Sequence, residues 1–97
     1  MLWNGSAVMT IVLDRKNRAV GEPQLSAPGL LGDSDDDYDL MDDVIDDALD
    51  ALGEINIKQR NNDDAVIERL RRAIRKSFRT RRGKSPTTDV HLVRLDG

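Results

Sequence analysis

The sequence of 97 residues contains no cysteine, one histidine, three prolines and three aromatic residues. Without cysteine, the chain can form no disulfide, no thiolate metal site and no cysteine nucleophile, which is typical of proteins in a reducing cytoplasm. Three aromatic side chains cannot fill a core. We therefore expect a core built from Val, Ile, Leu and Met.

Long apolar runs are also lacking. A membrane-spanning helix needs about 18–20 apolar residues, whereas the longest apolar run here is Ser6–Leu13. The start, M-L-W-N-G, lacks the basic flank and apolar region of a secretory signal. We therefore expect a cytoplasmic domain that makes no membrane contact. Because an apolar segment begins almost at residue 1, we also expect the chain to be cut from a longer protein.

Charge is unevenly distributed along the chain, although the formal net charge is only −3. Residues 33–54 include eleven acidic and no basic side chains, whereas residues 58–84 include eleven basic and three acidic ones. Such asymmetry indicates either two oppositely charged surfaces or one half of the chain shielding the other.

The apolar run Ser6–Leu13 is rich in β-branched residues, which favours a strand at the centre of a sheet. An all-polar loop follows at 14–18, and residues 19–27 can return as an antiparallel strand. Pro23 has no N–H to donate, so we place this second strand at a sheet edge. Residues 5–32 are therefore expected to form a β-hairpin.

Apolar residues spaced at i, i+3, i+4 and i+7 predict two helices after the hairpin. The acidic helix is expected at 33–53, capped by Asp33 or Ser34 and closed by Gly53. The basic helix is expected at 62–82, and a closing strand at 88–95. The predicted architecture is one α+β domain over 1–97, in the order β-β-α-α-β, with a three-stranded sheet and two α-helices packed on one face.

Neither catalytic nor metal-binding residues are predicted. Read as a calcium-binding EF-hand loop, the aspartate run from Asp33 has Tyr38 where glycine is needed and Val44 where a bidentate glutamate belongs. His91, the one histidine, falls inside a strand, and neither a P-loop nor a localised Ser/His/Asp set is present. We expect no catalysis, metal or cofactor in this chain.

The basic helix has two interpretations. Its arginines can neutralise the acidic helix, or they can bind RNA phosphates electrostatically. No aromatic residues are interleaved with them for stacking on bases. The candidate RNA contacts are Arg71, Arg72, Arg75, Arg79 and Arg82.

Taken together and in order, several segments resemble the C-terminal domain of bacterial ribonuclease J. These are the apolar strand, G-E-P-Q-L-S-A-P-G at 21–29, the acidic helix, the basic helix ending R-R-G-K-S-P at 81–86, and V-H-L-V-R-L at 90–95. The resemblance covers nearly the whole chain. The density of aspartate at 35–50 is a departure that it does not explain.

The resemblance implies a parent with metallo-β-lactamase and β-CASP domains, acting as a 5′-to-3′ exoribonuclease and endoribonuclease in RNA maturation and decay. Its zinc-binding, histidine- and aspartate-rich motif is absent here, so none of those residues can be assigned to this chain. For the C-terminal domain, the resemblance implies support of dimer or tetramer assembly. The implied partners are a second copy or the parent's catalytic domains, with RNA bound through the parent.

We therefore expect an assembly domain, with Val90 and Leu92 as candidate interface residues. Two alternatives stay open. One is an accessory RNA-binding module that uses the basic helix, and the other is a docking surface, on the acidic helix, for another RNA-degradation protein.

Overall fold

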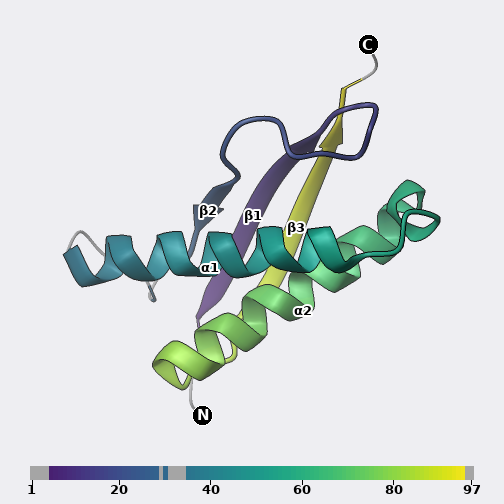
Figure 1. Ribbon diagram of the computed structural model, residues 1–97. Helices are drawn as coiled ribbons and strands as arrows, with labels where there is room; N and C mark the ends of the chain where they lie inside the picture. The colour runs from purple at the N-terminus through teal and green to yellow at the C-terminus, as the bar shows by residue number, and fades with distance from the viewer. Residues whose placement is uncertain (1–4, 29, 31–34, 96–97) are drawn as a thin grey trace.

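The computed structural model describes residues 5–28, 30 and 35–95. Its elements are β1 (Ser6–Leu13), β2 (Gln24–Ser26), α1 (Asp35–Glu54), the 3₁₀ helix η1 (Gln59–Asn61), α2 (Asp63–Arg82) and β3 (Thr87–Arg94). The three strands form one sheet in the order β2-β1-β3, and both helices lie against one face of it (Figure 1). The predicted α+β fold, with its β-β-α-α-β order and central first strand, is confirmed.

The sheet is mixed. β1 pairs with β3 in parallel along its whole length, from Ser6 opposite Thr87 to Leu13 opposite Arg94, and it pairs with β2 in the antiparallel sense. β2 is much shorter than the strand predicted over 19–27. Outside it, an isolated bridge joins Leu13 to Ala19. Between the two paired segments, Gly21 has a positive φ of 70° and Pro23 has no N–H, so the ladder is interrupted.

The polar loop after β1 is closed by Asp14. Its carboxylate accepts hydrogen bonds from the backbone N–H groups of Lys16 (2.8 Å) and Arg18 (3.0 Å). The Arg18 bond above all holds the pKa of Asp14 below its usual value. The pKa of Asp14 is lower in the folded domain than in the unfolded chain. The two hydrogen bonds therefore stabilise the loop at pH values above the ordinary pKa of aspartate, and this stabilisation is lost as the pH falls through the folded-state pKa.

The acidic helix runs one residue further than predicted. Gly53 lies inside α1, and the guanidinium of Arg60 donates to the carbonyls of Gly53 (2.9 Å) and Ile55 (3.0 Å). Arg60 thus binds backbone carbonyls at and just beyond the C-terminal end of α1, where carbonyl groups lack partners within the helix. The predicted caps Asp33 and Ser34 lie outside the described residues.

Both ends of the basic helix α2 are capped. The side chain of Asn62 accepts a hydrogen bond from the N–H of Ala65 (3.2 Å), as an N-cap does. At the other end, Gly83 has a φ of 66°, and its N–H donates to the carbonyl of Arg79. Neither α1 nor α2, within the described part of the chain, is long and apolar enough to cross a membrane.

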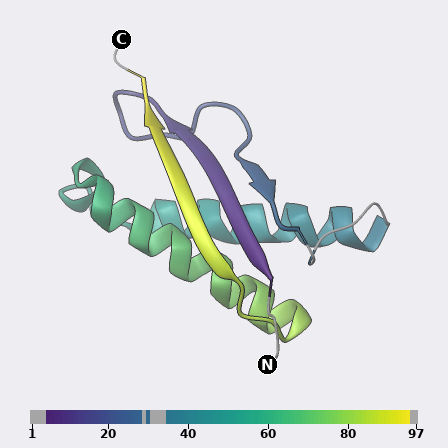
Figure 2. The same ribbon diagram turned by 180° about the vertical axis from the view of Figure 1, so that it is seen from behind.

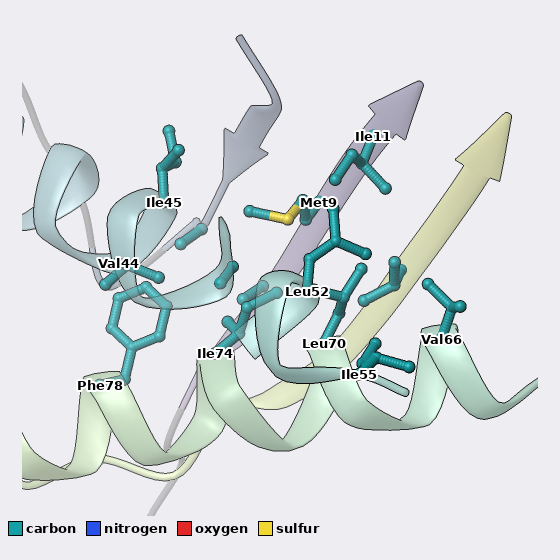
Figure 3. Packing of buried hydrophobic residues seen from close by; sticks show 14 of the residues in the cluster. Met9, Ile11, Val44, Ile45, Leu52, Ile55, Val66, Leu70, Ile74 and Phe78 are labelled. Carbon is teal, nitrogen blue, oxygen red and sulfur yellow. The ribbon is translucent and has the colours of Figure 1, made fainter. Parts of the chain in front are cut away.

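The core lies between the helices and the sheet. β1 contributes Met9, Ile11 and Leu13, which are fully buried. Figure 3 shows Phe78 of α2 beside Val44 of α1, where the two helices meet. The core is almost entirely aliphatic, as expected from the composition.

The opposite face of the sheet is uncovered by any other element of the described chain, as the view from behind shows (Figure 2). Side chains alternate along a strand, so residues of β1 and β3 between the buried ones project to this side. We call it the open face. In β1 and β3 it consists of Ser6, Val8, Thr10, Val12, Thr87, Asp89, His91 and Val93.

Candidate functional site

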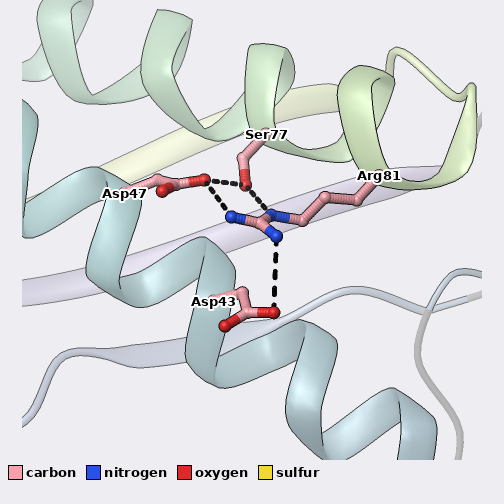
Figure 4. A network of polar contacts seen from close by, with 4 residues as sticks. All are labelled: Asp43, Asp47, Ser77 and Arg81. Atoms are coloured by element: carbon pink, nitrogen blue, oxygen red, sulfur yellow. Dashed lines mark hydrogen bonds and ion pairs between the residues drawn. The ribbon is translucent and has the colours of Figure 1, made fainter.

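Arg81 of α2 binds two aspartates of α1 where the two helices pack (Figure 4). Ser77 is buried, and its hydroxyl donates to Oδ2 of Asp47 at 2.6 Å. Arg81 lies 3.2 Å from the same Asp47 oxygen and 3.4 Å from a carboxylate oxygen of Asp43, and it also donates to the Ser77 hydroxyl. The network joins the acidic and basic helices within one domain.

Two further ion pairs link these segments. Arg82 binds Asp37 at 2.9 Å, and Arg69 binds Glu54 at 2.8 Å. Partly exposed pairs of this kind contribute about 0–1 kcal/mol each, so they fix the register of the helices more than they stabilise the fold. Part of the acidic face of α1 is thereby occupied within the domain.

Four other basic residues follow a different pattern. Within the part of the chain that the structure describes, the side chains of Arg75, Lys76, Arg79 and Lys84 form no hydrogen bond or ion pair. Arg71 and Arg72 both bind a single carboxylate, that of Glu68. The basic helix thus has one side that neutralises α1 and another with an excess of positive charge.

This excess lines a groove between α2 and the start of β3. A hollow of about 570 Å³ is lined by Glu68, Arg71, Arg72, Arg75, Ser85, Thr87 and Thr88. A second hollow of about 400 Å³ shares Arg72, Arg75 and Ser85 with it and adds Lys76 and Arg79. We call the two together the basic groove.

The structure brings four of the five candidate RNA contacts together in the basic groove: Arg71, Arg72, Arg75 and Arg79. Arg82 is placed against α1 instead. Sequence reasoning did not include Ser85, in the turn from α2 into β3, or Thr87, at the start of β3, both of which line the larger hollow. No sequence motif marks them, because their position depends on how β3 returns to the sheet.

The candidate interface residues Val90 and Leu92 lie on the helix-facing side of β3. Val90 is 8% exposed and belongs to the core, and Leu92 packs against the core. The structure therefore places Val90 where it supports the domain's own fold and offers no free surface for a partner.

The open face carries a different apolar group. Val12 and Val93 are paired across β1 and β3. Val20 donates its N–H to the Val12 carbonyl at 2.8 Å, and Leu95 donates to the Leu13 carbonyl at 2.9 Å. Val93, Leu95 and Val20 are 43%, 46% and 43% exposed. We call Val12, Val20, Val93 and Leu95 the apolar cluster.

No group of three or more His, Cys, Asp or Glu side chains in the described part of the chain is arranged to hold a metal ion. His91 lies exposed on the open face, opposite Thr10 in the neighbouring strand. The basic groove and the apolar cluster are the candidate partner-binding features.

The family model described as "Ribonuclease J C-terminal domain" matches residues 2–95, nearly the full length of the chain. The chain matches no curated protein.

Proposed function

The chain belongs to the ribonuclease J C-terminal domain family, and we propose that it is an assembly domain that joins two copies of its parent ribonuclease through the open face of its sheet. In this proposal the domain itself is not catalytic, and the parent carries out the hydrolysis of RNA. The observation that carries the proposal is the apolar cluster, which lies on the uncovered side of the sheet.

The clustering is unusual for a surface that remains in water. The large hydrophobic residues exposed in the described part of the chain are Val20, Tyr38, Ile57, Val93 and Leu95. Three of them belong to the apolar cluster, whereas Tyr38 and Ile57 lie apart on the helical side. Single exposed apolar residues are normal, but a group of them on one surface indicates a contact with another molecule.

A second copy of the chain suits this surface because the open face carries little charge. Among its residues in β1 and β3 only Asp89 is formally charged at neutral pH, since histidine is counted as neutral. In a two-fold dimer the same patch meets itself, so a patch dense in one sign of charge would repel its partner. Most of the acidic and basic residues lie on α1 and α2, on the far side of the sheet.

Substituting the cluster should abolish self-association without unfolding the domain. We expect Val93→Glu with Leu95→Glu to weaken dimerisation by more than about 100-fold, because a two-fold interface contains each new charge twice. Sedimentation equilibrium over a wide concentration range measures the effect.

The matched control is Tyr38→Glu with Ile57→Glu, which adds the same charge at exposed apolar residues away from the sheet. It should dimerise as the unaltered chain does. A monomeric unaltered chain at high concentration, or equal weakening by both double variants, would refute the proposal.

A further inference from the structure

We infer that the basic groove is a binding site for the phosphate backbone of an RNA strand. This inference goes beyond the assembly proposal and does not depend on it, because the groove lies on the helical side and the apolar cluster on the other face of the sheet. Its first support is the absence of internal partners for several cations.

The unpaired cations are unusual in a chain with 18 acidic residues against 15 basic ones. Arg81 and Arg82 reach the aspartates of α1, whereas Arg75 and Arg79 form no ion pair within the described chain. Neutralisation of the acidic helix therefore cannot explain why arginines lie on the groove side of α2. Only Glu68 among the groove residues carries a negative charge, and it is shared by two arginines.

The arrangement of the groove suits a chain of phosphates. Arg71, Arg75 and Arg79 recur every four residues, so they form a row along α2 with steps of about 6 Å. A guanidinium group can bind a phosphate through two parallel hydrogen bonds. A row of such groups can therefore contact several phosphates of one strand.

A hydroxyl-bearing residue also lines the groove. Ser85 belongs to both hollows, and its side chain makes no hydrogen bond within the described residues. Thr88, by contrast, donates to the carbonyl of Pro86 at 3.0 Å. Hydroxyls free to donate are common phosphate contacts beside arginine, so Ser85 can add a contact to the same backbone.

The chemistry favours recognition of the backbone over that of bases. No aromatic residue lines the groove, so stacking on bases has no platform there. A membrane surface is disfavoured because none of the exposed large hydrophobic residues lies on α2 or in the turn that follows it. An RNA strand fits best, since the parent family is a ribonuclease.

The test is fluorescence anisotropy of a labelled oligouridylate with the unaltered chain, in salt from roughly 50 to 200 mM. We expect Arg75→Gln with Arg79→Gln to weaken binding roughly tenfold at the lowest salt. The slope of log K against log salt should fall by about 1.4, which is about 0.7 for each lost phosphate contact. Both side chains are exposed and unpaired, so the melting temperature should not change.

The control is Arg15→Gln with Lys16→Gln, which removes the same charge from the exposed loop at the other end of the sheet. It should leave affinity and slope nearly unchanged. No binding by the unaltered chain at the lowest salt, or equal losses from both variants, would overturn the inference. Tighter binding of polyglutamate or of phosphatidylserine vesicles than of RNA would also overturn it, in favour of an acidic protein segment or a lipid surface.

Discussion

Val90→Asp is expected to unfold the domain, whereas Val93→Asp on the same strand is expected to leave it folded. The two valines point to opposite faces of β3: Val90 is in the core and Val93 is on the open face. Moving a carboxylate into an apolar core costs about 4–7 kcal/mol at neutral pH. A small domain has only about 5–15 kcal/mol of stability in total.

The destabilisation by Val90→Asp should depend on pH. Burial raises the pKa of a carboxyl group, so the folded variant holds its proton over a range in which the unfolded chain has lost it. Val90→Asp therefore loses stability relative to the unaltered chain as the pH rises. Near pH 4 the difference in free energy of unfolding between the two should be smaller. Urea unfolding followed by circular dichroism measures both variants at both pH values. Equal stability of the two variants would contradict the assigned orientation of β3.

Phe78→Ala is expected to cost about 3–5 kcal/mol, the usual range for emptying the site of a buried phenylalanine. Phe78 is fully buried and lies beside Val44 where α1 and α2 meet (Figure 3). Removing the ring leaves a cavity where the two helices meet, and the surrounding core side chains can relax into it only in part. The partly exposed ion pairs between the helices are too weak to compensate.

Urea unfolding of Phe78→Ala should show a lower midpoint with an unchanged slope. Phe78→Leu is the matched control, since it keeps most of the apolar volume and should lose clearly less stability. A loss below about 1 kcal/mol for Phe78→Ala would mean that the ring is not part of a tightly packed core.

The sequence predicted the fold well because its strongest patterns are unambiguous. The apolar run Ser6–Leu13 is long and β-branched enough to specify a central strand, and the apolar stripes of the helices repeat with one clear period. The short length of β2 depends on Gly21 and Pro23, and Pro23 had already placed this strand at a sheet edge. How far they would shorten it could not be predicted, because an edge strand is held by few contacts.

The two faces of β3 could not be assigned from sequence. Val90 and Leu92 alternate with His91 and Val93, and Leu95 follows, so both sides of the strand contain apolar residues. Only the packing against α2 shows that Val90 is inside. We therefore propose the apolar cluster, in place of Val90 and Leu92, as the interface.

The row of arginines was predictable because spacing along a helix places them on one side. Helical spacing places Arg81 within the buried stripe but puts Arg82 on the same side as Arg71, Arg75 and Arg79. The pairing of Arg82 with Asp37 could therefore not be predicted, because it depends on where the start of α1 packs. The place of Ser85 could not be found, since a turn between elements reaches its position only when the sheet has formed.

Assembly through the open face is tested most directly by nuclear magnetic resonance of the uniformly ¹⁵N-labelled chain, diluted from high to low concentration. We predict that amide shifts change with concentration at Val12, Val20 and Val93, while those of the exposed side of α2 stay constant. Constant shifts throughout, or changes confined to the helices, would contradict the account.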